Sequence, residues 1–441
     1  MPADPNHRND TTAALSPIDN DRRAALEIYE SAPMPDWRRS GFWNTNLRDL
    51  RLEELQPRHY ESVTSRAELP QVVQDMIGDE PYAGLIVQRG ASVIYSEVDP
   101  TNPDGVIACT LEDAFANHAE IASKYYGTRV DQKDGKFPAA NAALWTGGAF
   151  FYVPKNTVVD KPFQVINVID EPGVAQYART LAIVDVSGKA IFREYNVAPD
   201  FEGQAIHAGA TEIFVEDNAW AKVKTFQDWG AGEVYDISTK RVIIQRDAHA
   251  RWFPIHLGGH LTKQTLDIVT AADGADMRHN GVYFTQGDEH LDLFTTDMHE
   301  SGNTTGDTVW KGAATGTSRA SYEGLIEIVE GAQNSHTYLQ THSLMLSKQA
   351  KVDAIPSLIV KTDDVSASHG GTVGEVDEDQ VFYMRTRGIS RENAIRILVE
   401  GFFEPVVAQF EDERLEQIVR ERIAGKLAEA SEDIIAYAAT K

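Results

Sequence analysis

The chain has a single cysteine, Cys109, among its 441 residues. One cysteine excludes an internal disulfide and is typical of a protein in a reducing compartment. It also excludes an iron–sulfur cluster or a structural zinc ion held by thiolates of this chain alone. Because Cys109 lies in the apolar run Val106–Cys109, we expect a buried and unreactive thiol.

Long apolar runs and basic charge are also lacking. No run approaches the roughly 18–20 residues that a membrane-spanning helix needs, and residues 1–21 are too polar for a secretion signal, so we interpret them as a disordered lead-in. With 41 Lys and Arg against 67 Asp and Glu, the formal net charge is −26. This balance argues against nucleic acid and anionic membranes as partners. We therefore expect a cytoplasmic protein, long enough for two or three structural units.

The motifs of common enzyme classes are missing as well. The sequence has no Walker phosphate loop, no dinucleotide glycine fingerprint and no nucleophile elbow. His256 and His260 have the spacing of a helical zinc site, but the two glycines between them disfavour a helix. His290 and His299 are on or beside predicted strands, where hydrogen-bonded structural histidines are the better explanation.

A turn signature recurs in the middle of the chain, where polar residues are followed by alanine and an alternating strand. The alanines are about 28 residues apart, a period that in an all-strand region indicates the coils of a solenoid. This spacing holds for the signature at Ser187–Phe192, Glu216–Trp220, Gln245–His249 and Ala272–Asp276, and the signature occurs again later at Ser347–Val352. We predict a mainly β fold with a right-handed parallel β-helix over residues 140–375, and keep a β-sandwich as the alternative.

Regions on either side of the solenoid are predicted to be richer in helix. Residues 22–139 form a mixed, largely helical N-terminal region, with two strands around a glycine turn over 82–96. Residues 376–441 form a C-terminal helical domain, in which Ser390 is an N-cap candidate. Its amphipathic helices either cap the open edge of the solenoid or dock a partner. Between solenoid and helices, the stretch Asp363–Gly374 carries His369 before two glycines, which by pattern alone favours a turn.

Several of these segments carry a family likeness. They are Trp145–Lys155, His207–Glu212, Val223–Lys224, Gln227–Trp229, His299, Lys311–Gly312, Tyr322–Gly324 and the stretch from Asp363 to Gly388. With them the chain resembles the SufB/SufD family of iron–sulfur cluster assembly proteins, over most of the sequence from Trp145 to about Val407. In that family this region is a parallel β-helix.

The likeness is closer to SufD than to SufB. SufB-like chains carry cysteines at positions that correspond here to Thr341 and Asn196, so both thiolates are absent. His369 is similar to the SufD histidine that lies at the interface with SufB and is implicated in cluster assembly. Many SufD-like chains also have a cysteine where this one has Ala367. His342, beside the lost cysteine position, is a candidate additional ligand.

The resemblance implies a non-enzymatic SufD-like subunit of a SufB–SufC–SufD scaffold. It would pair with SufB through the β-helix and dock the SufC ATPase through its C-terminal helices, with Arg387, Ile395, Leu398, Phe402 and Phe403 as docking candidates. It would hold no cofactor stably alone, but would share transient iron or a nascent cluster with SufB, with His369 as the metal ligand. The alternatives are a SufD-like homodimer, and a β-helical enzyme such as a carbohydrate-active one, which needs clustered carboxylates on one face.

Overall fold

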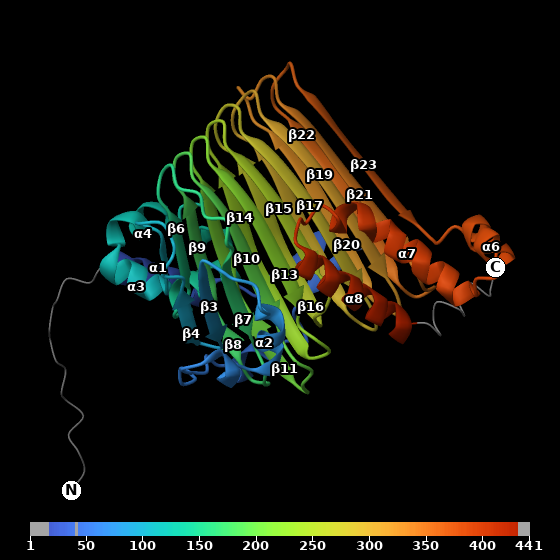
Figure 1. Cartoon of the computed structure of the whole chain (residues 1–441), viewed down its shortest axis with the longest axis horizontal. Helices are drawn as coiled ribbons and strands as arrows, with labels where there is room; N and C mark the ends of the chain where they lie inside the picture. Colours follow the sequence, from blue (N-terminus) through green and yellow to red (C-terminus); the bar gives the residue numbers. More distant parts are fainter. Residues whose placement is uncertain (1–16, 40–42, 431–441) are drawn as a thin grey trace, which may run out of the picture.

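Two parallel β-sheets face each other and form a solenoid of about eight coils in the computed structural model, which describes residues 17–39 and 43–430. Helices from the two ends of the chain cover its sides (Figure 1). The predicted β-solenoid is thus confirmed. In the described part of the chain, no helix is both long and apolar enough to span a membrane.

The first sheet has ten strands and the second has eleven. In spatial order the first comprises β23 (Ser366–Gly374), β21 (His336–Met345), β19 (Thr305–Ala314), β17 (Asp276–Thr285), β15 (His249–His256), β13 (Trp220–Asp228), β10 (Lys189–Val197), β7 (Phe163–Val168), β3 (Gly84–Arg89) and β4 (Ser92–Val98). The second comprises β22 (Lys351–Val360), β20 (Arg319–Ile328), β18 (His290–His299), β16 (Leu261–Thr270), β14 (Glu233–Ile244), β12 (Ala210–Val215), β9 (Arg179–Val184), β6 (Ala149–Val153) and β5 (Ile107–Cys109), with β8 (Ala175–Gln176) and β11 (Gln204–His207) beside them. Successive strands of the solenoid alternate between the sheets.

The recurring turn signature has a conformational cause. Ser187, Asn218 and Asp247 adopt positive φ angles of 57°, 57° and 53°, a conformation in which Asn and Asp are enriched. Each donates its backbone N–H to the next coil, as Asn218 does to the carbonyl of Arg246 at 2.8 Å. The alanine that follows, such as Ala219, is fully buried in the inner core. The polar residue turns the chain and the small one fits inside the coil, which explains the period.

Between the sheets is an inner core of aliphatic and aromatic side chains. The outer faces of the sheets are covered by different parts of the chain. N-terminal elements pack on the eleven-stranded sheet: α1 (Pro17–Ser31), α3 (Leu111–Asn117), α4 (Ala119–Tyr125) and α5 (Lys136–Leu144). A small β1 (Asp36–Arg39) and β2 (Trp43–Asn46) hairpin and three 3₁₀ turns, η1 (Leu52–Glu54), η2 (Arg66–Glu68) and η3 (Gln132–Asp134), complete this region.

The ten-stranded sheet is covered by C-terminal helices and by α2 (Gln71–Ile77). The C-terminal helices are α6 (Glu378–Thr386), α7 (Arg391–Val407) and α8 (Glu413–Glu429). The hydroxyl of Ser390 accepts a hydrogen bond from the backbone of Asn393, which confirms the predicted N-cap. α6 extends away from the solenoid, whereas α7 and α8 lie along it (Figure 1).

Three predictions about local structure need correction. The stretch around His369 is a strand, β23, and not a turn, because its backbone pairs with β21 over nine residues. The helix α1 begins at Pro17, within the predicted disordered lead-in, whose residues 1–16 are outside the described part of the chain. The sheets also begin earlier than residue 140, since β3, β4 and β5 join them. Local pattern did not reveal these pairings because they are formed with strands far along the chain.

Candidate functional site

The last coil of the solenoid is an open end. In the described part of the chain, β23 pairs only with β21 and β22 only with β20, so each sheet ends in an unpaired edge. Aliphatic side chains are exposed there: Leu358 is 37%, Ile359 43%, Val360 39% and Val373 38% exposed. Unpaired edges with exposed apolar side chains are prone to pair with another chain. The C-terminal helices do not cover this end, because α7 packs on β17 and β19.

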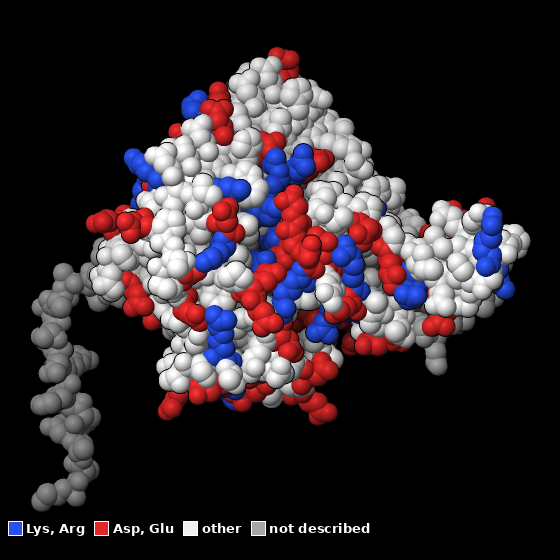
Figure 2. Space-filling model, viewed as in Figure 1, with Lys and Arg blue, Asp and Glu red and all other residues white. Residues whose placement is uncertain are grey.

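Charge is nearly absent from the outermost strands of the ten-stranded sheet. β21 and β23 contain no Asp, Glu, Lys or Arg, although the chain carries a formal net charge of −26. Figure 2 shows this region as an almost uncharged surface beside the mixed charges around the C-terminal helices. Depletion of charge is typical of the buried centre of an interface between proteins.

His369 is on the inward side of this open end. Its strand pairs in parallel with β21, which places His369 opposite Leu339 and Gly371 opposite Thr341. Side chains of a strand alternate between faces, and Ala367 packs against the inner core. His369 therefore faces the space between the two sheets, yet it is exposed because no coil follows.

The position that corresponds to a SufB-like cysteine, Thr341, is on the same inward face as His369 but pairs with Gly371. Thr341 is fully buried and faces inward, and a side chain at Gly371 would meet its methyl group. The second such position, Asn196, is buried in a polar network in which its amide donates to Glu194 at 3.0 Å. Thus the inward face presents an imidazole and no thiol at this end.

Cys109 cannot supply the missing thiolate. It lies on β5, at the opposite end of the eleven-stranded sheet from β22. Burial, with a smaller contribution from Asp113, raises the pKa of the Cys109 thiol to about 12. A thiol with such a pKa is protonated at neutral pH and is a poor nucleophile and a poor metal ligand.

The structure does not bring His342 together with His369. His342 pairs with Thr372, so alternation directs its side chain to the outer face, opposite to that of His369. Its Nδ1 is 2.8 Å from the Thr372 hydroxyl and its Nε2 is 3.2 Å from the Gln340 amide oxygen. Burial, then the charge of Lys311, lowers the pKa of His342. One metal ion cannot be held by both imidazoles in this geometry.

The other histidines considered from the sequence are held within the fold. His299 is fully buried and its Nδ1 is 2.7 Å from the Thr304 hydroxyl, and the Nε2 of His290 is 3.1 Å from the hydroxyl of Thr45. Burial lowers the pKa of both rings to about 4. Among the residues that the structure describes, no group of three or more His, Cys, Asp or Glu is placed to hold a metal ion.

Most of the predicted docking residues on the C-terminal helices point toward the solenoid. Ile395 and Phe403 are 3% and 1% exposed, and Phe403 stacks on Phe284 of β17 with 6.2 Å between ring centroids. Leu398 and Phe402 pack at the edge of the same core. The amphipathic stripe therefore attaches the helices to the sheet.

A different set of side chains is available to a partner. Phe382 is 67% and Tyr383 59% exposed on α6, and Ile397 is 39% exposed on α7. Arg387 is exposed beside them, and its guanidinium donates to the Tyr383 hydroxyl at 3.1 Å. Sequence periodicity missed these residues because they are outside the apolar stripe. Large aromatic residues outside the stripe were the signal that could have identified this surface.

Buried ion pairs attach the start of α8 to the solenoid. Asp412 accepts from Lys224 at 2.6 Å and from Arg193 at 2.6 Å. Burial acts to raise the pKa of Asp412, but the two cations outweigh it and lower that pKa. Further along α8, Lys426 is 2.9 Å from Glu289, whose pKa burial raises to about 7. All three pairs are largely shielded from water, so removal of one partner would leave the other charge buried, which is strongly destabilising.

Comparison with known proteins shows which family the chain belongs to. The family model described as "SUF system FeS cluster assembly, SufBD core domain" matches residues 167–402, and the one described as "SufBD protein N-terminal region" matches residues 6–165. An iron–sulfur cluster assembly SufBD family protein of Staphylococcus aureus (strain USA300) is 28% identical over 398 residues, which cover 87% of this chain and 84% of the relative. A protein of the same description from Staphylococcus haemolyticus is 28% identical over 397 residues, with the same coverage.

Proposed function

Because the chain belongs to the SufBD family of the SUF iron–sulfur cluster assembly system, we propose that it is a non-catalytic, SufD-like subunit of an assembly scaffold. The observation that carries this proposal is the position of His369, inward-facing and exposed at the open end of the solenoid. The site lacks the thiolates that a cluster needs, so a second subunit has to provide them. A reducing cytoplasm would keep the thiolates of the second subunit reduced, as cluster assembly requires.

The partner at the open end is a SufB-like subunit. Its own edge strands would pair with β22 and β23 and cover the exposed aliphatic side chains. Backbone hydrogen bonds would continue both sheets into the partner. His369 would then be enclosed between the subunits, where a neutral imidazole nitrogen can ligate iron. Iron and the nascent cluster are cargo shared with that subunit.

The C-terminal helices are the docking element for a SufC-type ATPase. The exposed Phe382 and Tyr383 on α6 supply aromatic anchors, which are common at the centre of protein interfaces. The ion pairs of Asp412 and Lys426 connect these helices to the solenoid. A force exerted by the ATPase on the helices would thus be transmitted to the solenoid, whose last strand carries His369.

Co-expression with SufB-like and SufC-like subunits tests the proposal, with native mass measurement of the purified complex. Val373→Lys places a charge on the terminal strand and should weaken association with the SufB-like subunit about tenfold or more. Val186→Lys is the matched control, because Val186 is 36% exposed in the turn between β9 and β10.

Three outcomes would contradict the proposal or the interface that it names. Absence of any complex with a SufB-like subunit, together with a dimer mass for the chain alone, would support the homodimer alternative. Hydrolysis of a polysaccharide by the purified chain would support the β-helical enzyme instead. Equal association of Val373→Lys and wild type would place the interface away from the open end.

A further inference from the structure

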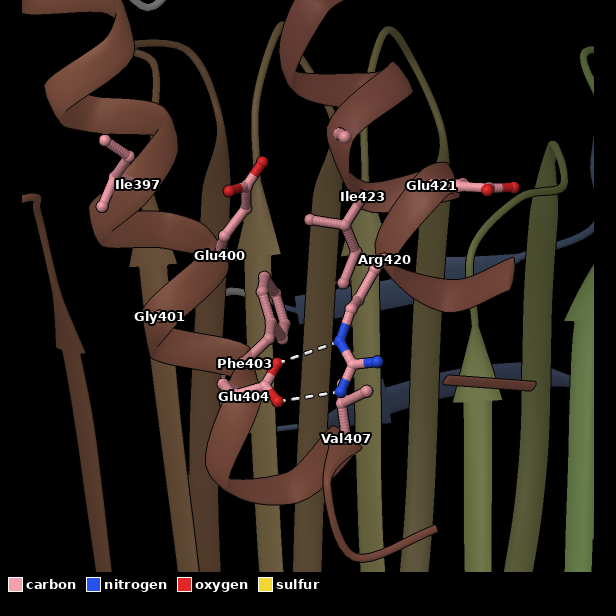
Figure 3. Close-up of a pocket in the computed structure, with 10 residues that line it drawn as sticks. Ile397, Glu400, Gly401, Phe403, Glu404, Val407, Arg420, Glu421 and Ile423 are labelled. Atoms are coloured by element: carbon pink, nitrogen blue, oxygen red, sulfur yellow. Dashed lines mark hydrogen bonds and ion pairs between the residues drawn. The ribbon is translucent and has the colours of Figure 1, made fainter. Parts of the chain in front are cut away.

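A surface groove lies between α7 and α8, on the side of these helices that faces away from the solenoid sheet. It has a volume of about 480 Å³, within the range of binding pockets. Phe403, Val407 and Ile423 form its floor. Figure 3 shows Arg420 of α8 reaching across to Glu404 of α7, so that this ion pair bridges the helices and closes one end of the groove.

The rim of the groove is acidic. Glu400 and Glu404 come from α7 and Glu421 from α8. Glu400 is paired at 3.1 Å with Arg396, which is outside the lining. The one cation of the lining, Arg420, is already paired with Glu404 at 2.8 Å and with Glu416 at 3.0 Å. An apolar floor with an anionic rim is complementary to an apolar stripe flanked by lysine or arginine.

Gly401 widens the groove at its centre. It is a glycine inside the 17-residue helix α7, where glycine costs about 1 kcal/mol relative to alanine. Packing within the chain does not require it, since an added Cβ would have no neighbour within 4 Å. A missing side chain in the wall of an apolar groove allows the backbone of another helix to approach closely.

We infer that this groove binds a cationic amphipathic helix of the SufC-type ATPase. The inference rests on the proposed docking role of the C-terminal helices and specifies the chemistry of what they bind. The apolar stripe of the helix would lie against Ile397, which is 39% exposed, and close to the backbone at Gly401. Its lysine or arginine residues would lie beside Glu400 and Glu421. The chain's own residues 431–441 suit the groove less well, because Glu432 and Asp433 outnumber Lys441.

Two fluorescent synthetic peptides probe the groove on the full-length chain. Both are 18-residue amphipathic helices with one leucine stripe, flanked by lysine in one and by glutamate in the other. We expect the lysine peptide to bind at least about tenfold more tightly in fluorescence anisotropy, and its affinity to fall with added salt. Equal binding of the two peptides, or binding of neither, would overturn the inference.

Gly401→Trp fills the groove without a clash inside the chain and should weaken binding of the lysine peptide about thirtyfold. The matched control is Gly425→Trp on α8, where an added Cβ also meets nothing within 4 Å but which is outside the groove lining. An equal effect of the two variants would contradict the site. So would tighter peptide binding after deletion of residues 431–441, because it would show that the chain's own end fills the groove.

The partner complex separates this inference from the proposed function. If a SufC-type ATPase binds wild type and Gly401→Trp equally well, the proposed docking role stands and the groove is not its site. If the ATPase binds neither the full chain nor its complex with a SufB-like subunit, the docking role itself fails. Release of the ATPase by Gly401→Trp alone, with Gly425→Trp unaffected, supports both.

Discussion

At the scale of single residues, the direction of a side chain decides which histidine faces the space between the two sheets at the open end. His369 and His342 are on paired neighbouring strands, but the register places one inward and the other outward. Both histidines were candidates from the sequence, and His369 was chosen because of its similarity to a SufD histidine. Facing direction could not be predicted, because it depends on which residue of β21 pairs with which residue of β23. A shift of one residue would have exchanged the two faces.

His256 gives a residue-scale prediction about pH. It is 3% exposed within the solenoid, and burial, followed by the charges of Lys240 and His279, lowers its pKa to about 3. A histidine with a lowered native pKa binds protons more readily when unfolded, so its contribution to stability is lost as pH falls below about 6.5.

Replacing His256 with phenylalanine should therefore reduce the acid sensitivity of the fold. Between pH 7.5 and pH 5 the wild type should lose about 2 kcal/mol through this residue alone, and His256→Phe should not. Urea denaturation at both pH values measures the difference. An equal loss in wild type and variant would mean that the ring is protonated or solvated in the folded protein.

At the scale of elements, the C-terminal helices show what sequence periodicity can and cannot predict. The amphipathic stripe of α7 and the N-cap of Ser390 were predictable, because both are local. What the stripe contacts was not, because a solenoid face and a partner offer the same apolar surface to a helix. The stripe packs on the sheet, and the side chains left for a partner are Phe382, Tyr383 and Ile397.

The connection between α7 and α8, where Asp412 is the N-cap of α8, gives a prediction at this scale. Asp412 neutralises the buried Lys224 and Arg193. Asp412→Asn retains a good N-cap residue but leaves the buried Lys224 without a carboxylate, while Arg193 keeps its ion pair with Glu80 at 2.7 Å. We therefore expect a loss of about 3 kcal/mol in the free energy of unfolding.

The neighbouring carboxylate provides the control for this connection. Glu411 pairs with Lys222, and its own side chain is 73% exposed although that of Lys222 is only 6% exposed. Because the carboxylate of Glu411 is in water, Glu411→Gln should cost less than Asp412→Asn. Urea denaturation compares the variants, and hydrogen exchange shows whether α8 is released in Asp412→Asn. Similar losses in both variants would mean that burial does not strengthen the Asp412 pairs.

At the scale of the whole molecule, the two ends of the solenoid differ. Antiparallel strands, β4 and β5, close the N-terminal end, and the β4 edge is paired further where Val63 donates its backbone N–H to Ile94 at 2.8 Å. The other end is open. A solenoid with one open end takes one partner there and forms a closed pair, whereas two open ends would allow filaments.

The solenoid itself was predictable because its turn signature recurs at a regular spacing in several coils, so each occurrence supports the others. The early strands that close its N-terminal end were not, because they occur once and lack the signature. The open end is likewise a property of the assembled sheets. The terminal strand β23 and the C-terminal helices are neighbours in sequence, whereas the closing strands β4 and β5 come more than 250 residues earlier. Local sequence pattern does not show how these segments are placed in the assembled sheets.

The measurement that tests the proposed role most directly is cluster formation on the reconstituted complex under anaerobic conditions. Iron, sulfide and visible absorbance would be compared for His369→Ala and His342→Ala, each in a complex of unchanged mass. We expect His369→Ala to lose cluster formation and His342→Ala to retain it, because only His369 faces the space enclosed by the partner. Normal cluster formation in His369→Ala would contradict a role for this histidine in the shared site.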